Sequence, residues 1–125
     1  MKKIVLPLFL LSTLLFAYSS NVINGYAVSI YDKNLIEENI QAIRKTKKNY
    51  NGLVYVKVYI FGKLFHENPK VKIGNSIGHI IKERSIVKNR KIIGKEITYK
   101  HHAVSKGYLE LSYSKKILDT KVFVK

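Results

Sequence analysis

The sequence predicts an α+β fold, in which one amphipathic helix packs on an antiparallel β-meander within a single domain. Three observations support this prediction. One segment near the N terminus repeats apolar residues at helical spacing, and several later segments alternate apolar and polar residues over short runs. Short turn sequences separate these runs, so consecutive strands are expected to pair as antiparallel neighbours.

The first twenty residues have the organisation of a cleaved signal peptide. Lys2 and Lys3 precede an apolar run over residues 4–17, and small residues follow that run. This order of charged, apolar and small residues is typical of a secretory signal. The run is also shorter than the roughly 20 apolar residues that a membrane-spanning helix needs. The alternative is a buried first element of a cytosolic domain.

Cleavage is expected between residues 17 and 20, after Ala17 or after Ser19. Residues 1–19 would then be the signal peptide, and residues 20–125 would form a single α+β domain, secreted or periplasmic. After cleavage we expect no integral membrane segment. The chain contains no cysteine, so disulfides do not brace this domain and its stability must come from a packed core.

A short strand over residues 26–30 is expected to precede the helix, which we expect over residues 34–49. Asn34 is the candidate cap, and Glu37 completes a capping box three residues later. Acidic residues in the first turn and basic residues in the last turn match the helix dipole. The apolar face consists of three isoleucines at helical spacing, Ile36, Ile40 and Ile43.

Residues 53–61 give the strongest strand signal. One of its two faces consists entirely of β-branched residues and is assigned to the core: Val54, Val56, Val58 and Ile60. A return over residues 64–66 and a short strand over 71–73 follow. Residues 76–87 suit either helix or strand, and we favour the strand.

The segment 86–93 predicts a hairpin about a polar turn, with a return arm over residues 92–100. Gly94 in that arm marks a bulge or twist. Two further strands are expected over residues 108–113 and 117–124, and the second of these is the candidate open edge of the sheet.

The formal charge is +15, from 23 basic and 8 acidic residues. A surplus of this size is explained by diffuse solubility, together with a biased codon composition, or by attraction to a polyanion or an anionic surface. Only three of the basic residues are arginines, which argues against sequence-specific nucleic-acid readout. The candidate polyanion-binding residues fall in two clusters: Arg44, Lys45, Lys47 and Lys48, then Lys82, Arg84, Lys88, Arg90, Lys91 and Lys95. The tyrosines Tyr55, Tyr59 and Tyr99 could add stacking surface.

Four histidines are the other candidates for chemistry: His66, His79, His101 and His102. With a carboxylate such as Glu67 or Glu96 they could supply zinc ligands, but adjacent residues on a strand point to opposite faces. The sequence has no HExxH motif, no cysteine nucleophile and no GxSxG elbow. We therefore expect no cofactor and assign no catalytic residue.

These observations favour an exported, small, basic and non-enzymatic binding protein that contacts an anionic envelope component or a protein partner. The anionic component would be a polysaccharide or a lipid headgroup surface, and the protein partner would add a strand at residues 117–124. One alternative is an exported metal-binding protein or hydrolase that uses the histidines. Another is an accessory subunit of a surface assembly.

Overall fold

The computed structural model describes residues 23–64 and 67–125, and within these ranges it contains nine strands and no helix. The predicted α+β class is therefore wrong, and the described chain is all-β. The expected signal peptide lies outside the described residues. The strands are β1 (Asn24–Tyr31), β2 (Glu38–Asn39), β3 (Gly52–Phe61), β4 (Lys70–Ile73), β5 (Ser76–Ile77), β6 (His79–Lys88), β7 (Lys91–Val104), β8 (Gly107–Tyr113) and β9 (Lys116–Val124).

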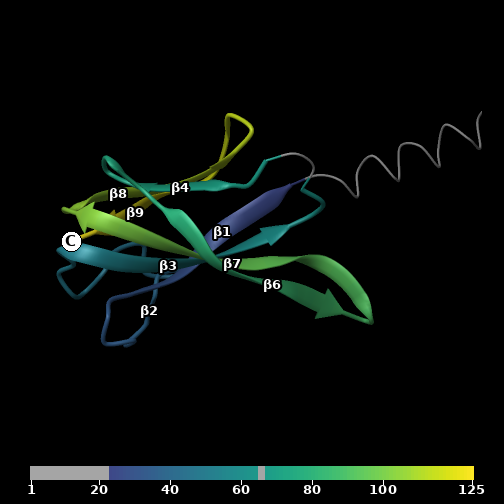
Figure 1. Ribbon diagram of the computed structural model, residues 1–125, viewed down its shortest axis with the longest axis horizontal. Coiled ribbons are helices and arrows are strands. Elements are labelled where there is room, and N and C mark those ends of the chain that lie inside the picture. The colour runs from purple at the N-terminus through teal and green to yellow at the C-terminus, as the bar shows by residue number, and fades with distance from the viewer. Residues whose placement is uncertain (1–22, 65–66) are drawn as a thin grey trace, which may run out of the picture.

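The strands form two antiparallel sheets, with the orders β2-β1-β3-β7-β6 and β5-β4-β8-β9. The predicted single meander is therefore also wrong, because β3 pairs with β7 and β4 pairs with β8, which are not consecutive along the chain. Figure 1 shows them as two layers, with β4, β8 and β9 on one side. Without the two-residue β2, this is the strand order of an immunoglobulin-type sandwich to which a short fourth strand has been added. The chain has neither the cysteine pair nor the tryptophan common in antibody domains. Such a fold hosts many functions and identifies none of them.

A single core lies between the sheets, and the period-2 alternation of the strands creates it. The predicted core face of β3 is confirmed, because Val54, Val56 and Val58 are fully buried. The opposing sheet supplies the aliphatic side chains that complete the core: Val71, Ile73, Leu109, Leu111, Val122 and Val124. This alternation explains why the sequence identified the strand faces correctly.

The predicted hairpin is confirmed as β6 and β7. The segment 76–87, which suited either helix or strand, divides between β5, in the opposite sheet, and β6. The register shifts where Ile86 pairs with Gly94 and Val87 with Ile92, so a bulge does lie beside Gly94. A side chain at Gly94 would place its Cβ 2.1 Å from the Ile60 carbonyl oxygen. Only glycine allows the two strands to approach this closely.

The predicted helix over residues 34–49 is wrong. Leu35 and Ile36 are exposed, as is Ile43, and of the three isoleucines expected on one apolar face only Ile40 is buried. The segment instead contains the short β2 and an irregular stretch over residues 40–51, which we call the connector.

The connector runs along β9, where its backbone groups satisfy the edge of that strand. Phe123 N donates to Arg44 O at 3.0 Å, and Thr46 N donates to Phe123 O at 2.9 Å. Tyr50 N donates to Lys125 O at 2.8 Å. These bonds compete directly with helical ones for the same backbone donors and acceptors. They also occupy the C-terminal part of the edge that the sequence offered for strand addition.

The Glu38 carboxylate holds the connector in shape. It accepts hydrogen bonds from Lys47 N at 2.7 Å, from Lys48 N at 3.2 Å and from the Tyr50 hydroxyl at 2.8 Å. Burial alone would raise the pKa of Glu38, but these hydrogen bonds hold that pKa below its ordinary value. The glutamate that was predicted to lie in a first helical turn instead organises a loop.

Asp119 joins the connector to both sheets. Its carboxylate accepts a hydrogen bond from Ala27 N on β1 at 2.8 Å and pairs with the guanidinium of Arg44, which also donates to Thr120 O at 2.9 Å. The Asp119 side chain is only 11% exposed. One carboxylate thus closes the side of the sandwich between β1 and β9.

We expect the substitution Asp119→Ala to lower the free energy of unfolding by about 2–4 kcal/mol, because it leaves a buried amide and a half-buried guanidinium without their acceptor. Urea denaturation measures the loss. Glu110→Ala is the matched control, since it removes a more exposed carboxylate that lies 3.9 Å from Lys72, and it should cost less than about 1 kcal/mol. Equal losses in the two variants would show that Asp119 does not close the sandwich.

Candidate functional site

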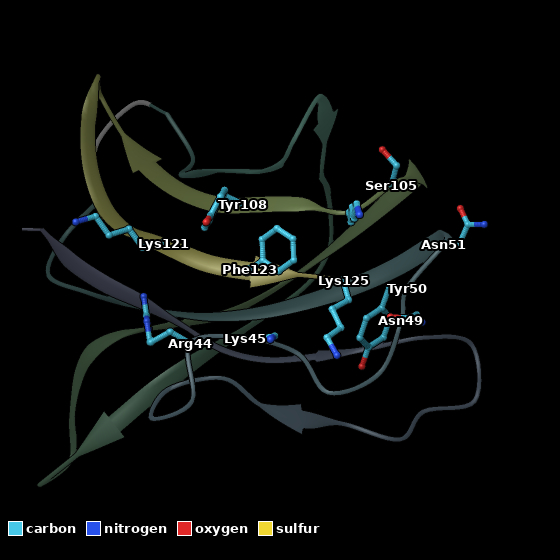
Figure 2. Close-up of a pocket in the computed structure, with 11 residues that line it drawn as sticks. Arg44, Lys45, Asn49, Tyr50, Asn51, Ser105, Tyr108, Lys121, Phe123 and Lys125 are labelled. Atoms are coloured by element: carbon cyan, nitrogen blue, oxygen red, sulfur yellow. The ribbon is translucent and has the colours of Figure 1, made fainter.

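A groove of about 830 Å³ lies where the connector meets β8 and β9. Figure 2 shows its lining, with Tyr108 and Phe123 in the middle and Lys121 and Lys125 to either side. We call it the cationic groove because five of its lining residues are basic: Arg44, Lys45, Lys106, Lys121 and Lys125. No aspartate or glutamate is among the described residues that line it.

The strand pattern brings an aromatic pair to the floor of the groove. Tyr108 and Phe123 face each other across β8 and β9, with ring centroids 5.1 Å apart and the rings inclined at 64°. Tyr108 is 60% exposed. An edge-to-face pair of this kind holds both rings in place and leaves apolar surface available to a ligand.

A bulge in β9 places Lys121 beside these rings. The register moves from Leu109–Val122 to Leu111–Asp119, which leaves Lys121 in the additional stretch of β9 with a φ of 67°. The left-handed region is uncommon for residues other than glycine, and bulges often redirect a side chain next to a site. Lys121 therefore projects from a distorted strand.

The positive charge of the groove comes mainly from lysines that have no acidic partner among the described residues. Asp119 largely neutralises Arg44, whereas Lys45, Lys106 and Lys121 take part in none of the ion pairs within 4.0 Å that the described residues form. These three lysines are solvent-exposed. An ammonium group is a compact, hydrated point charge, which suits diffuse attraction to carboxylate, sulfate or phosphate groups.

The structure brings only two of the predicted basic residues into this groove, Arg44 and Lys45. Lys48 instead pairs with Asp32 and lies 5.7 Å from the centre of the Tyr50 ring, and Lys47 is exposed outside the groove. Lys82, Arg84, Lys88, Arg90, Lys91 and Lys95 belong to the β6–β7 hairpin, toward the far end of the molecule from the C terminus (Figure 1). The two clusters do not form one patch.

Sequence reasoning missed most of the groove. Its alternation correctly placed Tyr108 and Phe123 on strands with buried residues between them, and that pattern identifies both as facing away from the core. Lys106 and Lys121 gave no local signal, because their proximity to Lys45 depends on the path of the connector.

The three tyrosines that were expected to add stacking surface lie in different parts of the structure. Tyr55 stacks on Tyr31 with ring centroids 5.0 Å apart, and Tyr59 packs edge-on against Tyr26, both on the outer face of the five-stranded sheet. Tyr99 is buried in the core, where its hydroxyl donates to the Pro69 carbonyl. None of the three lines the cationic groove.

The histidines do not converge on a metal site in the described part of the chain. His79 and His102 lie with ring centroids 5.8 Å apart, whereas His101 is fully buried on the core face, paired with Val54. The described residues contain no group of three or more histidine, aspartate or glutamate side chains able to hold a metal ion. The fourth candidate, His66, lies outside those residues.

His101 is buried at the cost of an unsatisfied nitrogen. Its Nδ1 lies 3.4 Å from the Ser76 hydroxyl, and its Nε2 has no hydrogen-bond partner among the described residues. Burial lowers the pKa of His101 to about 4, with a smaller opposing effect from Ser76. The ring therefore stays neutral at physiological pH.

No family model, curated protein or solved structure matches this chain. Across residues 23–64 and 67–125, no helix has the length and apolar character needed to cross a membrane. The function of this chain is therefore inferred from the chemistry of its surface.

The buried histidine predicts a specific loss of stability in mild acid. An unfolded histidine takes up a proton near pH 6.5, whereas folded His101 resists protonation until about pH 4, so acidification favours the unfolded chain between these values. The free energy of unfolding should fall by up to about 3 kcal/mol over this window because of His101 alone.

Urea denaturation at a series of pH values tests this, with His101→Leu as the variant and His102→Leu as its exposed neighbour control. His101→Leu should flatten the pH dependence between pH 6.5 and 4.5, whereas His102→Leu should not. Parallel curves for all three proteins would contradict a role for His101.

Proposed function

We propose that this protein is an exported, non-enzymatic binding protein that holds an anionic polysaccharide of the cell envelope in the cationic groove. The observation that carries the proposal is that three unpaired lysines, Lys45, Lys106 and Lys121, line one groove with the exposed Tyr108 and the half-buried Phe123, and that no carboxylate side chain is among the described lining residues. Charge and apolar surface are thus presented together, in one open groove.

An acidic polysaccharide fits both features of the groove. Its carboxylate or sulfate groups can approach the ammonium groups of Lys45, Lys106 and Lys121, and the apolar faces of its sugar rings can pack on Tyr108. A diffuse lysine site suits a polymer of repeated charges better than a single small anion, since each contact is weak and releases counterions. The described residues of the groove contain no arrangement of acid, base and nucleophile, which supports binding over catalysis.

Heparin affinity chromatography tests the groove directly. The triple variant Lys45→Gln, Lys106→Gln and Lys121→Gln should elute at clearly lower salt than the wild-type protein, with the slope of log affinity against log salt reduced by about two to three. The matched control removes three charges from the hairpin, with Lys88→Gln, Arg90→Gln and Lys91→Gln. It should elute close to the wild-type protein.

Equal shifts in the two triple variants would mean that heparin senses net charge alone, which would refute the groove proposal. Plain cation-exchange chromatography on the same set should show that equality, because it responds to total charge.

The aromatic floor makes a separate prediction. Tyr108→Ala should weaken heparin binding several-fold at every salt concentration and leave the salt slope unchanged, because it removes ring contact and no charge. Titration calorimetry at two salt concentrations measures both quantities. An unchanged affinity would show that the ligand touches only the lysines.

Export makes a third prediction. When the full chain is expressed in a bacterium with a periplasm, the recovered protein should begin at Tyr18 or Ser20, the residues after the two expected cleavage sites. N-terminal sequencing decides this. A chain that retains Met1 and stays in the cytoplasm would contradict the export proposal.

A further inference from the structure

The tip of the β6–β7 hairpin extends beyond the rest of its sheet. The last residue of β3, Phe61, pairs with Gly94, and Gly62 N donates to Ile93 O at 3.0 Å. Residues 87–92 lie past these contacts, so the tip is a two-stranded ribbon that no third strand flanks in the described chain. Figure 1 shows the hairpin reaching outward, away from the C terminus.

Two solvent-exposed aliphatic side chains are cross-strand neighbours in this ribbon. Val87 and Ile92 are cross-strand partners, and they are 61% and 70% exposed. Adjacent aliphatic side chains at a protruding tip form an exposed apolar patch, whose contact with water is unfavourable. Exposed apolar patches are candidate surfaces for interaction with a partner.

A recess of about 620 Å³ continues this apolar surface between the hairpin and the end of β3. Its lining includes four apolar residues, Phe61, Leu64, Ile92 and Ile93, and two lysines, Lys91 and Lys95. The tip therefore offers an apolar pair, an apolar recess and neighbouring cations.

The charge at the tip has one sign. Lys88 pairs with Lys91 across the strands, and Asn89 and Arg90 form the turn, both with positive φ as a two-residue hairpin turn requires. No carboxylate occurs between residues 84 and 95.

The two acidic residues of the hairpin lie further back, and both are engaged. Glu96 accepts a hydrogen bond from Arg84 at 2.8 Å, and Glu83 lies 4.0 Å from Lys95. Three cations at the tip are thus left to face an external anion.

We propose that this hairpin tip docks on the surface of an anionic lipid bilayer. Val87 and Ile92 enter the headgroup region, and Lys88, Arg90 and Lys91 contact lipid phosphates. Basic residues that border apolar ones suit such an interface, because the lysine stems follow the apolar surface while the ammonium groups remain among the headgroups.

The chemistry of the tip favours lipid over other polyanions or a second copy of the chain. A binding site for single-stranded nucleic acid typically offers aromatic side chains on which bases can stack, whereas the exposed pair at this tip is aliphatic. A second copy would place Lys88, Arg90 and Lys91 against the same cations of its partner. An anionic bilayer complements both the aliphatic pair and the charge.

Docking at this tip is independent of the cationic groove. The groove lies between the connector, β8 and β9, whereas the tip lies beyond the end of β3. A protein held to lipid by the hairpin would keep the groove accessible to a polysaccharide. The two sites can therefore fail or succeed separately when they are tested.

Tryptophan reporters test the docking, because the chain has no tryptophan of its own. The full chain is expressed as Ile92→Trp and as Ile117→Trp, and both proteins are recovered in the same processed form. Ile117 is the matched control: it is 54% exposed at the β8–β9 hairpin, where the turn is Ser114–Lys115, but its strand partner is Ser112.

With vesicles of mixed phosphatidylglycerol and phosphatidylcholine, the emission of Ile92→Trp should shift to shorter wavelength and that of Ile117→Trp should not. Vesicles of phosphatidylcholine alone should shift neither. If both reporters shift alike, or neither shifts on anionic vesicles, the proposal is wrong.

Vesicle flotation gives a second readout that does not depend on the new tryptophan. Val87→Thr with Ile92→Thr keeps β-branched residues in the strands and all of the charge, yet it should lower binding to anionic vesicles about tenfold or more. Ile117→Thr should bind as the wild-type protein does, and circular dichroism confirms that each variant is folded.

The two triple charge variants complete the test. Lys88→Gln with Arg90→Gln and Lys91→Gln should lose vesicle binding, and the groove variant with Lys45, Lys106 and Lys121 changed to Gln should retain it. Equal loss in both would show that lipid responds to net charge, which would overturn docking at the tip. Heparin retention reports on the groove in the same proteins, so failure of either proposal is visible separately.

Discussion

The path of the connector along β9 is the constraint on which the rest of the structure depends. A two-sheet sandwich leaves unpaired backbone groups at its lateral edges, and here one side is closed by backbone bonds between residues 44–50 and the end of β9. Asp119 adds a side-chain link from that edge to β1. Because buried polar groups are costly when unpaired, these bonds hold the two sheets together and exclude a helix in the connector. They also cover part of an edge that would otherwise invite strand addition.

The same path creates the cationic groove. Closing β9 brings Lys45 from the connector into the same groove as Lys121 from the strand and Lys106 from the corner between β7 and β8, with Tyr108 and Phe123 in the middle. Each residue alone is an ordinary surface residue of a basic protein. Their combination around an aromatic pair distinguishes this surface from a uniform coat of charge. The stability of the sandwich and the shape of the proposed binding site therefore depend on one set of contacts.

Two of the places where positive charge gathers differ in their chemistry. At the groove, lysines surround aromatic rings, a combination suited to charged sugars. At the hairpin tip, cations surround an aliphatic pair, a combination suited to lipid headgroups. In our proposals, one end of the molecule contacts a bilayer while the groove holds a polysaccharide, so the protein would bridge two anionic components of an envelope.

The sequence by itself determined most of the longer strands and their faces, but not which strands pair across the two sheets. Alternation in β3, the polar turn of the β6–β7 hairpin, the bulge at Gly94 and the pairing of β8 with β9 all followed from local patterns, because side-chain period and turn chemistry are local properties. Tertiary structure decided the segment 34–49, where Asn34, Glu37 and Ile40 match the local pattern of a helix but no helix forms. The carboxylates there serve other partners: Glu38 takes the Lys47 and Lys48 amides and the Tyr50 hydroxyl, and Glu37 takes the Ser29 hydroxyl. It also decided the groove, since residues more than sixty positions apart meet only when backbone bonds to β9 outcompete helical ones.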